Sequence, residues 1–262
     1  MNPEVEPAPA SEVAAEAERL VQAADGAGLK VRLMGGIAFW LNSPSVRRPP
    51  YARGYRDMDF VARSGQSRTL RAFLETQGYV GDRMFNAIHG AQRLIYTAAH
   101  GRWSIDILFD ELRMSHRVDL RDRLAGPGPT LPLADLLLTK LQIWQVNEKD
   151  LGDALCLLAD QPLVDGAGHG HRSDAVNGIE TGRLVGVLAA DWGFCHTAER
   201  NLDRIAELGR ARPPAGATFD GAKQAELLRA AIERAPKTLG WRTRARIGER
   251  VQWYEEPEEA RR

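Results

Sequence analysis

The stretch Tyr55-Arg-Asp-Met-Asp-Phe-Val-Ala62 decides the fold. Its alternation predicts a β-strand with the side chains of Asp57 and Asp59 on one face and Met58 and Phe60 on the other. Two carboxylates side by side repel each other and resist burial. A divalent cation removes that conflict, because Mg²⁺ accepts one or two carboxylates together with substrate phosphates. The alternative is an ordinary surface strand with two solvated aspartates.

A second short strand, predicted over 103–109, offers a third carboxylate. Its apolar residues Ile105 and Ile107 share one face, and Asp106 lies on the other. An acid inside such an apolar strand lowers stability unless it has a partner. Three carboxylates from neighbouring strands can hold two metal ions about 3.5–4 Å apart, the arrangement used for in-line phosphoryl or nucleotidyl transfer.

The pair Gly35-Gly36 lies between a strand predicted over 30–34 and a helix formed by the sequence IAFWLN. Glycines at such a junction let the backbone approach a ligand closely, and the exposed N–H groups of the helix start favour phosphate. The alternative is a tight turn from strand to helix.

Lys140 lies on the apolar face of a helix predicted over 132–146, in one stripe with Leu136, Leu137 and Trp144. A lysine on a buried face needs an anionic partner or a cavity. Triphosphate oxygens would serve. An internal ion pair with Asp150 or Asp153 would serve equally well.

The other segments predict an α+β half followed by a helical half. A Pro-, Ala- and Glu-rich segment over 1–10 is expected to be disordered, the α/β domain covers 11–128, and the helical region covers 129–262. The sequence predicts helices over 12–25, 37–42, 67–77, 132–146, 150–159, 178–190, 191–209, 220–235 and 241–254, and strands over 30–34, 55–62, 92–98 and 103–109. His100-Gly101 is a hairpin signal between the last two strands.

Composition narrows the classes of partner. With 35 basic and 35 acidic side chains the net charge is zero, which argues against a broad nonspecific duplex binder. Basic residues gather over 47–56 and 237–250 and could receive an RNA backbone; for 237–250 a solvated helix face is an equal alternative. Two cysteines, no signal sequence and no apolar span predict a cytoplasmic protein that does not enter a membrane. His169 and His171 form an HxH, which favours a solvated loop over a metal site.

Taken together, the stretches LMGGIAFWL, RGYRDMDFV, WSIDILF, LPLADLLLTKLQIW and KDLGDALCLL resemble the DNA polymerase β-like nucleotidyltransferase superfamily. The likeness is closer to its abortive-infection and type IV toxin branch, and it runs from about Val31 to Leu158. It implies a nucleotidyltransferase-type mixed β-sheet flanked by helices, with a mostly α-helical C-terminal region.

The resemblance also implies site residues. Asp57, Asp59 and Asp106 would be the catalytic carboxylates and would bind two Mg²⁺ ions. The nucleotide would be held by Gly35, Gly36, Arg53, Arg56, Lys140 and Asp150. The expected reaction is Mg²⁺-dependent transfer of NMP from an NTP to an RNA end such as tRNA, a protein, or a small molecule such as an antibiotic. A protein with this activity could be a toxin that is paired with a cognate antitoxin. The rival is a non-catalytic module that binds nucleotide or RNA and keeps the fold.

Overall fold

The computed structural model describes residues 8–165 and 178–256. The chain divides into two compact units, each described by itself below. The first unit comprises Met1–Leu41, Arg53–Glu111 and Asp119–Leu131, and the second comprises Asn42–Ala52, Leu112–Val118 and Pro132–Arg262. The sequence division between 128 and 129 lies close to the main boundary. The segments 42–52 and 112–118 fall in the second of these units, and the domain division expected from the sequence stays a prediction.

The first unit is built on a five-stranded mixed sheet in the order β1-β2-β5-β4-β3. β1 is Val31–Met34, β2 is Asp57–Ala62, β3 is Tyr79–Gly81, β4 is Arg93–Ala98 and β5 is Ser104–Phe109. β2 and β5 are parallel, and the other neighbouring strands are antiparallel. The hairpin between β4 and β5 turns at Gly101, which has φ +72°, as the His100-Gly101 signal predicts.

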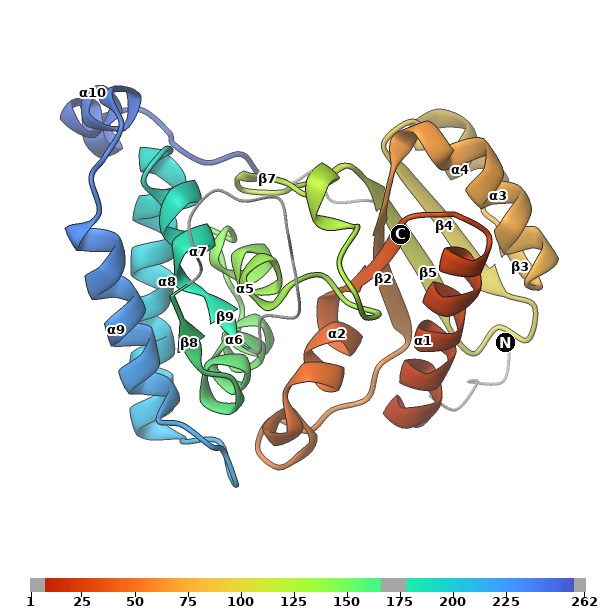
Figure 1. Ribbon diagram of the computed structural model, residues 1–262, viewed down its shortest axis with the longest axis horizontal. Helices are drawn as coiled ribbons and strands as arrows, with labels where there is room; N and C mark the ends of the chain where they lie inside the picture. Colours follow the sequence, from red (N-terminus) through yellow and green to blue (C-terminus); the bar gives the residue numbers. More distant parts are fainter. Residues whose placement is uncertain (1–7, 166–177, 257–262) are drawn as a thin grey trace. The chain divides into compact units, whose positions relative to one another are not determined.

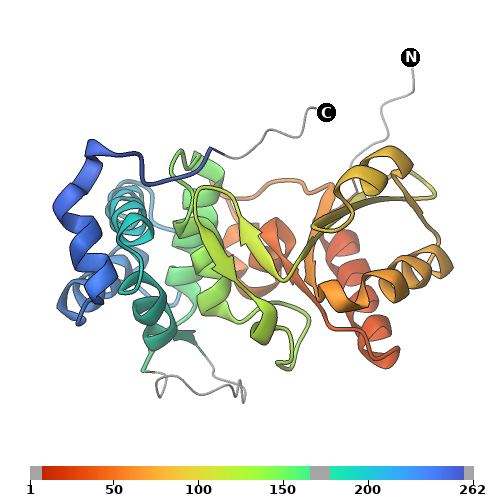
Figure 2. The ribbon, with the colours of Figure 1, turned by 90° about the horizontal axis from the view of Figure 1, so that it is seen from above.

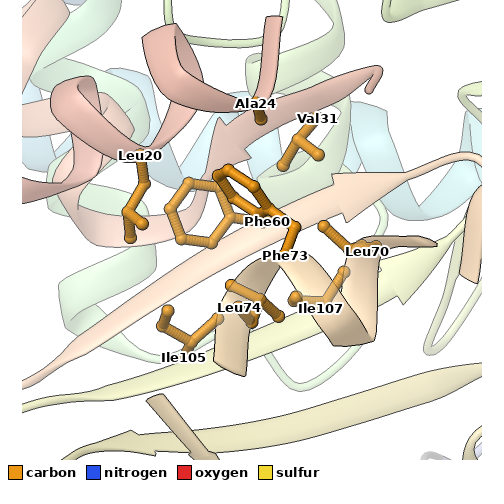
Figure 3. A pocket seen from close by; sticks show the side chains of 9 residues that line it. All are labelled: Leu20, Ala24, Val31, Phe60, Leu70, Phe73, Leu74, Ile105 and Ile107. Carbon is orange, nitrogen blue, oxygen red and sulfur yellow. The ribbon is translucent and has the colours of Figure 1, made fainter. Parts of the chain in front are cut away.

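Alternation along the strands separates an apolar face of the sheet from a polar one. Met58, Phe60, Ile105 and Ile107 are all at most 2% exposed. Helices α1 (Ala10–Gly26) and α3 (Ser67–Thr76) cover this apolar face. Figure 3 shows where side chains from both helices and from the strands meet in the core: Leu20, Ala24, Val31, Phe60, Leu70, Phe73, Leu74, Ile105 and Ile107. The aspartates of β2 and β5 therefore lie on the opposite face, as predicted.

Shorter elements complete the first unit. Helix α2 (Gly35–Asn42) follows β1 without a loop, and α4 (Arg83–His89) lies between β3 and β4. Asp82 caps α4, because its side chain accepts a hydrogen bond from the Phe85 N–H. The 3₁₀ turns are η2 (Ser64–Gln66) and η3 (Arg121–Arg123). β3 and α4 are additions to the elements predicted from the sequence.

The second unit is mostly helical. Its helices are α5 (Leu133–Leu141), α6 (Glu148–Asp160), α7 (Thr181–Leu188), α8 (Trp192–Ala211), α9 (Gly221–Arg234) and α10 (Leu239–Ile247), with 3₁₀ turns η1 (Pro44–Arg47) and η4 (Gly248–Arg250). Two small sheets pair β6 (Glu111–Arg113) with β7 (Arg117–Asp119) and β8 (Leu163–Val164) with β9 (Ile179–Glu180). α8 and α9 lie side by side (Figure 2) and both pack on α6.

The α+β class, with a mixed sheet flanked by helices and a helical region after it, is thus confirmed. Several predicted element bounds differ from the structure. The helix predicted over 241–254, for example, is α10 and covers Leu239–Ile247. The first helix begins at Ala10, directly after Pro9, and not at residue 12. The helix predicted over 132–146 ends at Leu141. Its freed carbonyls at Leu141 and Ile143 accept hydrogen bonds from the Asn201 side chain instead of continuing the helix.

Among residues 8–165 and 178–256, no helix combines the length and the apolar composition that a membrane-spanning helix requires. Ala8 is buried and Ala10 starts a helix, within the segment 1–10 for which disorder is expected. The HxH of His169 and His171 lies outside the described residues.

Candidate functional site

Asp59 and Asp106 stand opposite each other on the polar face of the sheet. β2 and β5 run parallel, and the register pairs Asp59 with Asp106 and Asp57 with Ser104. Paired residues on adjacent strands direct their side chains to the same face. Asp57 is exposed, whereas Asp59 and Asp106 are half-buried. The fold therefore places the three predicted carboxylates on one face of two neighbouring strands.

Polar side chains of the same sheet bind Asp57 and Asp106. The Ser104 hydroxyl donates to Oδ1 of Asp57 at 2.6 Å. Arg93, on β4, donates from Nε to both oxygens of Asp106, at 2.8 Å and 3.0 Å, and its Nη2 also donates to Oδ2. Asp106 is thus an ion-paired carboxylate in this structure.

The pairing with Arg93 is visible in the electrostatics of the guanidinium. The hydrogen bonds that Arg93 donates to Asp106, together with the nearby charges of Asp106 and Asp59, raise the pKa of Arg93 above its ordinary value, although burial acts in the opposite direction. The aromatic ring of Phe85 lies 5.7 Å from the guanidinium carbon. Arg93 is therefore a fixed positive charge beside both Asp106 and Asp59.

Gly35 lies directly against Asp59. It follows Met34, the β1 residue that pairs with Asp59 in the sheet. Gly35 has φ +64°, and a Cβ atom added to it would come within 2.7 Å of Cγ of Asp59 and closer still to Oδ2. Only glycine combines this left-handed backbone with so close an approach to the carboxylate. The first turn of α2 therefore begins beside the acid of β2.

Gly36 carries a different neighbour. A Cβ atom there would lie 2.7 Å from Cε1 of Tyr55 and 3.4 Å from Nη2 of Arg53. The Arg53 guanidinium stacks on the Tyr55 ring at 4.8 Å. Arg56 is exposed just before β2. Of the two predicted arginines, Arg53 lies at the helix start and Arg56 is turned to solvent.

This helix start has the ordinary chemistry of an anion site. The first N–H groups of a helix lack intrahelical acceptors and carry a partial positive charge. α2 has no acidic residue in its first turn, and Arg53 adds a full positive charge beside it. A phosphate placed there would meet N–H donors, a guanidinium and no repelling helix side chain.

Lys140 lies in the second unit, within an ion-pair cluster between α5 and α6. Its ammonium bonds to Asp150 and lies 3.1 Å from Oδ2 of Asp153. Burial lowers the pKa of Lys140, but the two carboxylates raise it more, and the net change is upward. Of the two alternatives for this lysine, the internal ion pair is the one found. Contact with a triphosphate stays a prediction.

The chemistry of the aspartates fits a hard cation, because all their donor atoms are carboxylate oxygens on one face of the sheet. The three carboxylates do not converge on one point in this structure. Among residues 8–165 and 178–256, no group of three or more His, Cys, Asp or Glu side chains is placed to hold a metal ion. Arg93 donates to both oxygens of Asp106, and the Ser104 hydroxyl donates to Asp57. Holding two cations would therefore need Asp106 to leave Arg93.

Arg93 and Ser104 are polar residues at this site that are not among the site residues predicted from the sequence. A signal for both exists in the alternation. Leu94 and Tyr96 are buried on the apolar face, so Arg93 must share the face of Asp106 once β4 pairs with β5. Predicting the contact between Arg93 and Asp106 would have needed the register of the β4–β5 hairpin.

Comparisons with known proteins give no close relative: no protein-family model and no curated protein sequence matches the chain. Among solved structures, lincosamide antibiotic adenylyltransferase LnuA with lincomycin bound is 13% identical, with a TM-score of 0.39 over 53% of this chain and 92% of that chain. The antibiotic-resistance factor ANT(2'')-Ia is 11% identical, with a TM-score of 0.38 over 57% of this chain and 84% of that one.

An antigenic nucleotidyltransferase-like protein from Paracoccidioides brasiliensis is 14% identical, with a TM-score of 0.42 over 88% of this chain and 96% of that one. Identities and TM-scores this low assign neither a family nor an activity to the chain. The abortive-infection and type IV toxin branch likewise stays a prediction.

Proposed function

We propose that this protein is a Mg²⁺-dependent nucleotidyltransferase that moves NMP from an NTP to an acceptor. The observation that carries the proposal is the close approach of Gly35 to Asp59, whose register partner on the adjacent strand β5 is Asp106. A left-handed glycine at a helix start, pressed against a carboxylate that has a second carboxylate opposite, joins an anion-binding element to a cation-binding one. Phosphate bound to metal needs both.

In the proposed reaction an acceptor hydroxyl oxygen attacks the α-phosphorus of the NTP. The new bond is between that oxygen and phosphorus, the bond from the α-phosphorus to the bridging oxygen breaks, and pyrophosphate leaves. The N–H groups at Gly35 and Gly36 and the guanidinium of Arg53 hold phosphate oxygens. Asp106, once released from Arg93, accepts the hydroxyl proton.

Asp57, Asp59 and Asp106 would hold the Mg²⁺ ions, which neutralise charge on the phosphates and leaving group. Lys140 as a triphosphate contact, Asp150 as part of its support and Arg56 as an outer phosphate contact belong to the same proposal. For Lys140 this contact requires exchange of its carboxylate partners for phosphate.

The test is label transfer from each α-³²P NTP in the presence of Mg²⁺. Total cell RNA, total cell protein and a panel of hydroxyl-bearing antibiotics serve as separate acceptors. Asp59→Asn should reduce transfer by about 10²-fold or more, because one charged ligand is lost from the reacting centre. Asp122→Asn is the matched control, since Asp122 is an exposed acid of the same unit, and should transfer normally. Transfer that survives Asp59→Asn would refute the role of Asp59.

A second candidate is a non-catalytic module that binds nucleotide or RNA. The ion pair between Arg93 and Asp106 favours it, because a permanently paired Asp106 neither holds metal nor accepts a proton. This candidate predicts NTP or RNA binding that Asp106→Asn leaves unchanged, with no label transfer to any acceptor. Transfer by the wild-type protein that is lost in Asp59→Asn excludes it.

A further inference from the structure

Arg93 occupies both oxygens of Asp106. Its Nε lies 2.8 Å and 3.0 Å from the two carboxylate oxygens, and its Nη2 donates to one of them. The two side chains are 35% and 24% exposed, so water screens the pair only in part. A divalent cation that is to bind Asp106 needs the lone pairs that Arg93 now uses.

The guanidinium is held by its surroundings as well as by Asp106. β4 fixes its backbone opposite Leu108 of β5, and the Phe85 ring lies against it from α4. Asp59 adds a second negative charge nearby. Because the sheet positions Arg93 on the acidic face, its charge is present before any cation arrives.

We propose that Arg93 is a resident counter-ion that competes with a divalent cation for Asp106. The role of Asp106 as a metal ligand rests on the function proposed above; the competition does not require catalysis. Arg93 stabilises the row of acids in the absence of a cation, and it weakens the affinity of the empty site for one. Arg93 is therefore a positioning residue rather than a catalytic one.

The size of the effect follows from the occupancy of the pair. If Arg93 holds Asp106 for about nine-tenths of the time, the apparent affinity for a cation at that carboxylate is about tenfold lower than the intrinsic one. Removing the guanidinium should therefore raise the apparent affinity for a cation by that factor. Removing a positive charge elsewhere on the unit should leave the affinity nearly unchanged.

The experiment measures Mn²⁺ binding to the full chain, without nucleotide, by electron paramagnetic resonance of the free ion. Arg93→Gln and Arg93→Met both remove the guanidinium, and the methionine keeps an apolar stem beside Phe85. Arg102→Gln is the control. It also removes one positive charge from this unit, but Arg102 pairs with Glu12 and not with Asp106. Thermal unfolding checks that each variant is folded.

The expected result is about tenfold tighter Mn²⁺ binding in both Arg93 variants, a change of less than about twofold in Arg102→Gln, and loss of the gain when Asp106→Asn is added. Unchanged binding in the Arg93 variants overturns the proposal, as does an equal gain in Arg102→Gln. Label transfer without a Mn²⁺ gain refutes only the competition. A Mn²⁺ gain without label transfer refutes only the proposed function.

Discussion

Replacing Gly35 with alanine tests the junction between helix α2 and the acidic strand. Two separate costs arise at this position. An L-residue at φ +64° is strained by about 1–2 kcal/mol. The new methyl group would also lie 2.7 Å from Cγ of Asp59 and 2.9 Å from its Cβ, so the strand or the carboxylate must shift.

Two other glycines of the same unit allow the two parts of this cost to be separated. Gly28 has φ +73° and nothing within 4 Å of an added Cβ, so Gly28→Ala measures the backbone strain alone. Gly65 has neither a left-handed φ nor a close neighbour. Overpacking adds about 1–3 kcal/mol, so Gly35→Ala should lose about 2–5 kcal/mol of unfolding free energy, Gly28→Ala about 1–2 kcal/mol, and Gly65→Ala almost nothing.

Urea denaturation gives the three free energies, and label transfer gives the functional consequence. Gly35→Ala should lose transfer well beyond its loss of folded protein, because the methyl group displaces Asp59. Gly28→Ala should transfer in proportion to its folded fraction. Equal destabilisation of Gly35→Ala and Gly28→Ala would refute the close contact with Asp59, and the argument for a joined anion and cation site would fall with it.

Two further predictions concern the second unit. Burial lowers the pKa of His116 to about 4, below the value it has in the unfolded chain. The unfolded chain therefore binds the proton more readily than the folded protein does. Stability is complete above the unfolded pKa and falls as the pH drops from about 6.5 towards 4, by up to about 3 kcal/mol. Urea denaturation at pH 7.5 and pH 5 should show this loss in the wild type and a smaller one in His116→Gln, and equal losses would contradict it. Lys140→Met should cost about 3–5 kcal/mol, because it removes the cation from the buried Asp153. A loss below about 0.5 kcal/mol on urea denaturation would show that the cluster contributes little, and Lys149→Met at an exposed lysine of α6 is the control.

Alternation was sufficient to predict the strands that carry the site. β4 and β5 begin within one residue of their predicted starts, and the predicted faces of Asp57, Asp59 and Asp106 are those of the structure. The strand predicted from Tyr55 starts at Asp57 instead. Local pattern suffices here because one apolar face must be buried, which fixes the side on which each residue points.

Tertiary partners account for what the sequence could not supply. The helix of Lys140 ends at Leu141, where Asn201, sixty residues later, donates to the carbonyls of Leu141 and Ile143. Gln142 also uses its side chain elsewhere, accepting from the His116 N–H at 3.0 Å. No propensity of the segment 132–146 encodes these contacts, so its periodicity extends past the end of the helix.

The ion pair of Arg93 changes what the row of aspartates implies. Like-charge repulsion between acids on one strand was the reason to expect a divalent cation. In the folded chain, Arg93 and Ser104 already relieve part of that repulsion. A row of acids is thus compatible with a fold that is stable before any metal binds. The feature that an internal counter-ion does not explain is the close approach of the Gly35 backbone to Asp59. A tight turn from β1 into α2 already calls for a left-handed glycine. Under the proposed function the same approach would also let a phosphate bind between the helix start and a carboxylate-held cation, and the transfer lost in Gly35→Ala beyond its loss of folded protein separates the two explanations.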